Sequence, residues 1–226
     1  MYNQFPEEWS IAYKDLTFKI KPMGFKHTGL FPEQAVNWDF LREAIRKAKA
    51  EGREDIKVLN LFAYTGGATI AALAEDASVV HVDASKGMVN YAKDNARLSN
   101  VVDRHVRWIV DDCVKFVQRE IRRGNKYDII IMDPPSYGRG TGGEIWKLED
   151  SVYDFVELAA QVLSDEPIMV LINSYTTGLS PSVMEYILGS VISPKFGGRV
   201  TCDEIGLPVT QTGFHLPCGA SAIWQK

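Results

Sequence analysis

The sequence predicts an α/β protein with a doubly wound parallel sheet, and three features of the chain support this prediction. Apolar runs typical of buried strands alternate with amphipathic segments from residue 57 to residue 191. Helical stretches separate the runs, and connections of that length join neighbouring strands in parallel. Several runs also end at an acidic residue, on the sheet edge where open α/β sheets bind their ligands.

The expected elements follow one another regularly along this part of the chain. We expect strands over residues 57–62, 78–82, 106–110, 127–132 and 167–172, and helices over residues 68–74, 86–98, 112–123, 150–163 and 182–191. Two further strand-like runs, 199–205 and 214–224, have no helix between them. They should therefore pair antiparallel.

The first 56 residues form a separate section. Residues 10–21 alternate apolar and polar side chains around Asp15, which predicts a hairpin or a short meander. Residues 24–32 form a loop rich in glycine and aromatic residues, and residues 33–50 have the spacing of an amphipathic helix. We divide the chain into an N-terminal segment, residues 1–32, and a main domain, residues 33–226.

Composition and charge limit the classes of protein to consider. The chain has 226 residues, three widely spaced cysteines and a net charge of −4. The charge argues against a non-specific nucleic-acid coat, although a local basic patch stays open. The cysteines form neither a zinc pattern nor a disulfide framework, and we expect no metal. No apolar run is long enough for a membrane span, and the beginning of the chain lacks a signal-peptide pattern, so we expect a cytoplasmic protein.

The turn after the first parallel strand predicts a ligand site. Residues 59–67 read L-N-L-F-A-Y-T-G-G, whereas a pyrophosphate would require G-x-G-x-x-G. The turn suits a ligand that lacks a diphosphate and approaches the backbone closely, as S-adenosylmethionine (SAM) does. The contact residues expected in this turn are Asn60, Phe62, Ala63, Tyr64, Thr65 and Gly66.

Three acidic residues at strand ends support this ligand. Asp83 could accept hydrogen bonds from both ribose hydroxyls, and Asp112 could accept one from the adenine amino group. Asp133 begins the rigid stretch D-P-P-S-Y. Asp83 and Asp112 each precede a helix, so either one alone could equally be an N-cap. Their occurrence with Gly66 and Asp133 at the ends of four successive strands favours a binding site.

Four segments give the chain a resemblance to a known family. They are F-K-H-T-G-L-F-P-E-Q (25–34), N-L-F-A-Y-T-G-G (60–67), V-D-A-S (82–85) and M-D-P-P-S-Y (132–137). With these segments the chain resembles the class I SAM-dependent methyltransferases, and among them the bacterial 23S ribosomal RNA cytosine-5 methyltransferases. The resemblance implies a seven-stranded sheet of order 3-2-1-4-5-7-6 with an antiparallel last strand, a methyltransferase activity and a base in ribosomal RNA as substrate.

The resemblance also implies roles for particular residues. Phe31 and Gln34, in the first segment, should cover the methionine end of SAM. Ala84 and Ser85 should accompany Asp83 at the ribose, and Cys113 should line the adenine pocket. Asp133, Pro134, Pro135 and Tyr137 should hold the acceptor base. An acid and a proline carbonyl would accept the hydrogens of an exocyclic amine, although Tyr137 comes one position later than in typical loops of this kind.

Two departures from the resembling group leave the chemistry open. No segment is long enough to be the PUA RNA-binding module that these RNA enzymes usually carry. Cytosine-5 methylation requires a thiolate, yet Ser136 and residues 173–176 stand where related enzymes have cysteine. Only Cys218 or Cys202 could supply the thiolate, and Cys218 is the better placed of the two. The alternative interpretation of Cys218 is a small buried apolar residue. The sequence thus leaves open the methylated atom, the oligomeric state and two rival functions: methylation of a protein or small molecule, and SAM binding without turnover.

Overall fold

The computed structural model describes residues 6–24, 27–139 and 145–226, and its centre is one seven-stranded sheet. The strands run in the order β10 (Arg199–Pro208), β11 (His215–Gln225), β9 (Met169–Ser174), β6 (Ile129–Met132), β3 (Lys57–Leu61), β4 (Ser78–Asp83) and β5 (Val106–Val110). The last five strands in this order, from β9 to β5, are parallel, whereas β11 pairs antiparallel with both β9 and β10. This arrangement confirms the predicted strand order and the antiparallel ending.

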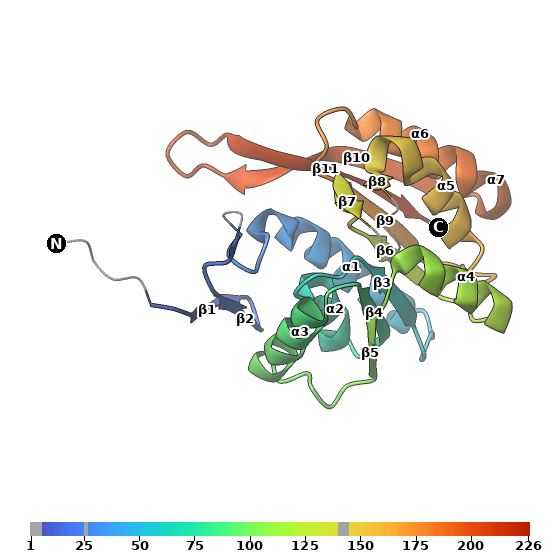
Figure 1. Cartoon of the computed structure of the whole chain (residues 1–226). Helices are drawn as coiled ribbons and strands as arrows, with labels where there is room; N and C mark the ends of the chain where they lie inside the picture. Colours follow the sequence, from blue (N-terminus) through green and yellow to red (C-terminus); the bar gives the residue numbers. More distant parts are fainter. Residues whose placement is uncertain (1–5, 25–26, 140–144) are drawn as a thin grey trace.

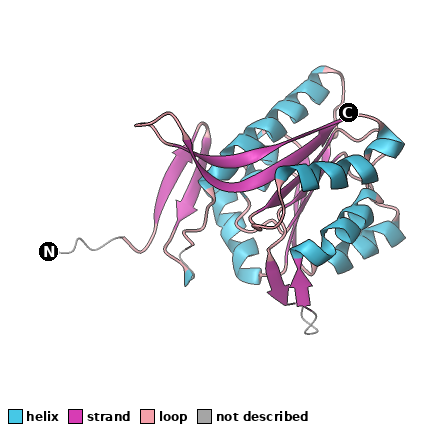
Figure 2. Ribbon diagram, turned by 90° about the horizontal axis from the view of Figure 1, so that it is seen from above, coloured by secondary structure: helices cyan, strands magenta, loops and turns pink. Residues whose placement is uncertain are grey.

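Helices cover both faces of the sheet (Figures 1 and 2). One face carries α1 (Ala35–Ala50), α2 (Gly67–Ala74) and α3 (Lys86–Leu98). The other carries α4 (Cys113–Arg123), α5 (Leu148–Ala160) and α6 (Pro181–Val191), with the short α7 (Ser193–Phe196) after it. No helix in the described part of the chain is long and apolar enough to cross a membrane.

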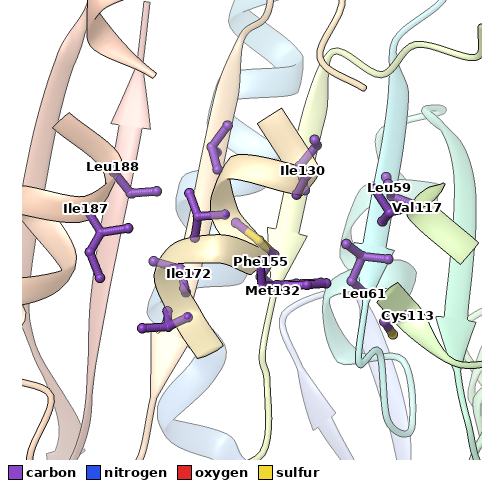
Figure 3. Close-up of a cluster of buried hydrophobic side chains, with 14 of the residues drawn as sticks. Leu59, Leu61, Cys113, Val117, Ile130, Met132, Phe155, Ile172, Ile187 and Leu188 are labelled. Carbon is purple, nitrogen blue, oxygen red and sulfur yellow. The ribbon is translucent and has the colours of Figure 1, made fainter. Parts of the chain in front are cut away.

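Two apolar cores result, because successive side chains of a strand point to opposite faces. On β3, Leu59 and Leu61 face α4, α5 and α6, whereas Val58 faces α1 and α2. Figure 3 shows the first core, in which Met132 of β6 and Ile172 of β9 lie near Phe155 of α5. Strands buried on both faces need nearly continuous apolar runs, which explains the clear strand pattern of the sequence.

The N-terminal segment packs against the second core. Strands β1 (Trp9–Tyr13) and β2 (Leu16–Ile20) form the predicted hairpin, and Phe18 of β2 packs on Trp38 of α1 with ring centroids 5.1 Å apart. Arg42 fixes the hairpin turn by donating to both carboxylate oxygens of Asp15, at 2.6 and 2.8 Å. A 3₁₀ turn, η2 (Pro32–Gln34), precedes α1, so the α-helix begins two residues later than predicted.

The structure adds a feature that the sequence did not predict. Strands β7 (Tyr137–Arg139) and β8 (Ile145–Lys147) form a small antiparallel sheet of their own after the D-P-P-S stretch. The sequence G-R-G-T-G-G (138–143) predicts a substrate-facing loop that orders on binding, and its residues 140–143 lie outside the described residues. The other helices and strands begin and end within three residues of the predicted positions. Strand β9, for example, ends at Ser174, whereas residue 172 was predicted.

Candidate cofactor-binding site

A hollow lies at the carboxyl end of β3. Residues from the 60–67 turn, from the end of the 25–34 segment and from the end of β6 line it. Many predicted contact residues line it, namely Phe31, Gln34, Asn60, Phe62, Ala63, Tyr64, Thr65 and Asp133. Six residues that the prediction missed also line it: Leu30, Trp38, Gly67, Ala68, Ile131 and Asn173.

The turn from β3 to α2 is held in an uncommon backbone conformation. Phe62 and Tyr64 have positive φ angles of 54° and 49°, which non-glycine residues adopt rarely and mostly at functional sites. Gly66 has φ 87°, and a Cβ there would lie 2.9 Å from the Cβ of Ala92 in α3. Only glycine therefore fits this N-cap position of α2.

Tyr64 supplies a polar group without a partner in the wall of the hollow. Its hydroxyl is buried and makes no hydrogen bond. Burial raises the pKa of Tyr64 to about 12, with the charge of Asp83 adding to the effect, so the hydroxyl keeps its proton as a donor. An unpaired buried hydroxyl is costly unless a ligand satisfies it.

Asp83, at the end of β4, lies beside this turn. Its carboxylate accepts from the backbone N–H of Tyr64 at 2.8 Å and from that of Ser85 at 2.8 Å. Burial raises the pKa of Asp83, and these two hydrogen bonds oppose that rise. The N-cap of α3 is Ser85, whose hydroxyl accepts from the N–H of Met88, so Asp83 retains lone pairs for a ligand. Ala84 is exposed beside it.

Asp112 and Cys113 lie outside the hollow, at the start of α4. Asp112 accepts from the N–H of Lys115 at 2.9 Å and is the N-cap of that helix. The sulfur of Cys113 accepts from the N–H of Phe62 at 3.2 Å and so supports the strained turn from behind. Burial raises the pKa of the Cys113 thiol, which keeps it protonated. The adenine contacts expected of these two residues remain a prediction.

The 25–34 segment is tied to the turn. Thr65 donates from its hydroxyl to the carbonyl of Gly29 at 2.6 Å, and the ring centroids of Phe31 and Tyr64 are 5.5 Å apart. Phe31 also lies 5.5 Å from the ring of Tyr175, just beyond β9. Aromatic side chains from three separate segments thereby meet beside the hollow. Residues 25 and 26 lie outside the described residues.

A network of buried hydrogen bonds fixes Gln34, the last residue of this segment. Its Oε1 atom accepts from the side-chain amides of Asn37 at 2.8 Å and Asn173 at 3.0 Å. Asn37 also donates to Ser221 of β11 at 2.8 Å. The residues of this network come from η2, α1, β9 and β11, so the network exists only in the folded chain.

Asp133 occupies the end of β6, where it lines the hollow. Burial raises its pKa to about 7, and the charge of nearby Glu33 adds to the rise. The carboxyl group is therefore partly protonated at neutral pH in the ligand-free protein. A group with such a pKa can gain or lose a proton when a charged ligand arrives.

The D-P-P-S-Y loop after Asp133 is anchored at several points. Trp146 of β8 donates from its indole N–H to the carbonyl of Pro135 at 2.7 Å. The hydroxyl of Thr176 donates to that of Ser136 at 2.6 Å. Tyr137 begins β7 and is 55% exposed, so it lies on the surface and does not line the hollow. The proline carbonyl expected to hold the acceptor is, at Pro135, already paired with Trp146.

None of the three cysteines lines the hollow. All three are free thiols. Cys202 donates to Glu185 of α6 at 3.2 Å. Cys218 is the extra residue of a β-bulge in β11, between Pro217, paired with Gly206, and Gly219, paired with Ile205. Its sulfur donates to the carbonyl of Leu216 at 3.3 Å.

Comparison with known proteins agrees with this geometry. Residues 3–152 match the family model described as S-adenosylmethionine-dependent methyltransferase. The chain belongs to the SAM-dependent methyltransferases. A SAM-dependent methyltransferase from Agrobacterium tumefaciens of known structure is 34% identical and superposes over 99% of this chain and 72% of its own, with a TM-score of 0.89.

One further solved structure shares the fold, and one further relative is similar in sequence. SMU.776, provisionally described as a methyltransferase and solved with S-adenosylhomocysteine (SAH), matches 99% of this chain and 58% of its own at 21% identity and a TM-score of 0.75. The ribosomal RNA large subunit methyltransferase K/L of Shewanella baltica is 32% identical over 150 residues, which are 65% of this chain. The match covers only 19% of that relative's length.

The residues around the hollow fit SAM, the cofactor of this methyltransferase family. Asp83 offers a ribose acceptor, and the unpaired Tyr64 hydroxyl offers a donor. The 60–67 turn has no phosphate-binding glycine pattern, which suits a ligand without a diphosphate. When bound, SAM supplies an electrophilic methyl group on a positively charged sulfur. The described residues contain no group of three His, Cys, Asp or Glu side chains that could hold a metal ion.

Proposed function

We propose that the chain binds SAM in this hollow and transfers its methyl group to a base of ribosomal RNA. The observation that carries the proposal is the convergence of the 60–67 turn and Asp133 on one hollow, with Asp83 hydrogen-bonded to the backbone of Tyr64 in that turn. Relatives named as ribosomal RNA methyltransferases support RNA as the substrate class. The three free cysteines are compatible with a reducing cytoplasm, where we place the protein.

The acceptor atom is, on this proposal, a nitrogen. Carbon-5 methylation of a pyrimidine needs a thiolate within reach of the base. Cys113 is buried behind the turn with a raised pKa, and Cys202 contacts Glu185 on α6. A nitrogen acceptor already carries a lone pair, so the protein has only to align it with the methyl group and accept a proton. Asp133, with its pKa near 7, is suited to both tasks.

Two sets of variants test the proposal. With SAM labelled in its methyl group and ribosomal RNA as acceptor, a chain lacking all three cysteines should still methylate RNA. Asp133→Ala should lose at least about a hundredfold in rate, because it removes a positioning contact at the reacting atom. A cysteine-free chain whose activity is lost and then restored by Cys218 alone would contradict the nitrogen assignment. Transfer of label to protein but not to RNA would contradict the substrate class.

A further inference from the structure

The β10–β11 hairpin extends beyond the sheet on the edge that carries the hollow. Strand β11 pairs with β9 only from Ala220 to Gln225, and Ala220 lies opposite Ser174, the last residue of β9. The earlier residues of β11 pair with β10 alone. Because β9, β6 and β3 are parallel, the hairpin passes the edge at which all three strands end. Figures 1 and 2 show it projecting from the rest of the sheet. We call residues 205–219 the arm.

The arm is fixed at its base and at its tip. At the base, β10 lies beside η2, and a Cβ on Gly219 would lie 2.9 Å from the ring of Tyr175. At the tip, the N–H of Val209 donates to the carbonyl of Phe214 at 2.8 Å, and the N–H of Gly213 donates to the carbonyl of Val209 at 2.9 Å. A binding surface that is already ordered loses little conformational entropy when a ligand arrives.

One face of the arm is apolar, and it is the face on the same side of the sheet as α1 and η2. Directly paired residues of neighbouring strands share a face, and so do residues two positions apart on one strand. Thr201 of β10 pairs with Ile223, which belongs to the core beneath α1 and α2. Alternation along β10 therefore places four apolar side chains of the arm on that face: Leu207 and Val209, with their partners Leu216 and Phe214.

The apolar face is open to solvent and carries no acidic residue. Phe214 is 75% exposed and Leu216 is 56% exposed. Exposed apolar side chains that gather on one face mark an interaction surface. Residues 205–219 contain neither Asp nor Glu, although the chain has 29 of these residues and a net charge of −4. The arm therefore offers an aromatic ring to a polyanion without carboxylates that would repel its phosphates.

A strand of RNA fits the arm better than a second copy of the chain does. A stable protein interface buries about 800 Å² on each partner, whereas Phe214 and Leu216 are the large exposed apolar side chains among the described residues of the arm. The arm is also continuous with the hollow, because Tyr175 at its base lies 5.5 Å from the ring of Phe31 in the wall of the hollow. Single-stranded RNA is bound largely by stacking its bases on aromatic side chains.

We propose that the arm is an RNA-docking surface on which Phe214 stacks against a base of the substrate strand. This inference rests on the proposed function, which supplies RNA as the substrate class. The rise of a strand places Phe214 roughly 17 Å beyond the end of β9. The stacked base is therefore a neighbour of the methylated base, a few nucleotides away along the strand. Phe214 positions the RNA and does not touch the reacting atoms.

Replacement of Phe214 tests the stacking contact. Phe214→Ala should weaken the binding of a fluorescein-labelled single-stranded oligoribonucleotide about tenfold in fluorescence anisotropy, as expected for one lost base–aromatic stack. With ribosomal RNA as methyl acceptor, KM for RNA should rise by a similar factor, whereas kcat and the SAM affinity should stay within about twofold of wild type. Phe214→Trp should bind at least as tightly as wild type. Phe214→Leu, which is apolar but has no π face, should resemble the alanine variant.

Tyr186→Ala is the matched control, because Tyr186 is a 72% exposed aromatic residue on α6, which covers the opposite face of the sheet. This variant should bind RNA as the wild type does. Thermal melting should show that every variant is folded, since both replaced side chains lie largely in solvent. A second copy of the chain as the occupant predicts a different result: sedimentation would show a wild-type dimer that Phe214→Ala separates into monomers.

The outcomes separate this inference from the proposed function. An RNA affinity of Phe214→Ala within about twofold of wild type would overturn the docking surface. Wild-type affinity in Phe214→Leu, a dimer that depends on Phe214, or no RNA binding by the wild type would also overturn it. If the wild type binds RNA through Phe214 but transfers no methyl group to it, the docking surface stands and the proposed methylation of RNA fails.

Discussion

Gln34 donates from its side-chain amide to the hydroxyl of Tyr175 at 2.7 Å and so joins two residues 141 positions apart. The contact links η2 to the residue that follows the carboxyl end of β9. The same Gln34 side chain accepts from Asn37 and Asn173 with its oxygen. One glutamine therefore fixes the positions of η2, α1 and the sheet relative to one another beside the hollow.

Replacing Gln34 by alanine should lower the free energy of unfolding. The side-chain amide of Asn173 loses its acceptor on Gln34, and that of Asn37 loses one of three acceptors. Leaving a buried donor unsatisfied costs about 1–3 kcal/mol. Tyr175→Phe is the comparison, because it removes the hydroxyl's hydrogen bonds with Gln34 and Glu33 while keeping the ring beside Phe31. Urea denaturation should show the larger loss for Gln34→Ala. Equal midpoints for both variants would show that the network contributes little to stability.

Asp83→Ala should weaken SAM binding by at least about tenfold, because hydrogen bonds to a charged group contribute about 1.5–3 kcal/mol. It also frees the backbone N–H of Tyr64, which loosens the strained turn. Asp83→Asn keeps an acceptor oxygen and should fall between the wild type and the alanine variant. Calorimetric titration with SAM gives the comparison. An unchanged dissociation constant in the alanine variant would remove Asp83 from the site.

Trp146→Phe should slow methyl transfer while leaving SAM affinity within about twofold of wild type. The substitution keeps an aromatic ring beside Phe62 and Phe155 but removes the indole N–H that holds the carbonyl of Pro135. A looser acceptor loop positions the base less well, and small misplacements are costly in rate. Single-turnover kinetics at saturating SAM would detect this. A lower SAM affinity with an unchanged rate would contradict the view that this loop positions the acceptor base and does not bind SAM.

Gly67→Ala should destabilise the protein by about 1–3 kcal/mol, as overpacking of a tight contact does. A Cβ at this position would lie 2.6 Å from Cζ2 of Trp38, on the wall of the hollow. Adding Trp38→Phe should recover part of the loss, because the smaller ring withdraws from the new methyl group. Thermal melting of the wild type, the two single variants and the double variant gives a double-mutant cycle. Strict additivity of the two effects would argue against a direct clash.

Asp133→Asn should make the ligand-free protein more stable at pH 8, with the difference vanishing near pH 4. Burial and Glu33 raise the folded-state pKa of Asp133 to about 7, above its unfolded value. A raised pKa means that the favourable contribution is complete below the unfolded pKa and is lost as the pH rises to 7. Asparagine does not titrate and avoids this loss. A pH-independent difference in melting temperature between variant and wild type would contradict the raised pKa.

The amino-acid sequence by itself determined the fold class and where along the chain we propose the cofactor site. Strands buried on both faces give continuous apolar runs, and helices between them give amphipathic ones, so both elements are readable from local periodicity. The sequence also predicted that the 60–67 turn and Asp133 lie close together, because parallel strands bring their carboxyl ends to one edge of the sheet. The antiparallel pairing of β10 and β11 followed from the missing helix between them.

Only the tertiary structure decided which side chains complete the site. Trp38 and Asn173 reach the hollow because α1 and β9 pack together around it, and no local pattern in the sequence predicts contacts across such separations. The backbone conformation of the turn likewise decided that Cys113 supports Phe62 from behind. Secondary structure follows from local spacing, whereas burial, charge pairing and the pKa of Asp133 depend on neighbours that only the folded chain brings together.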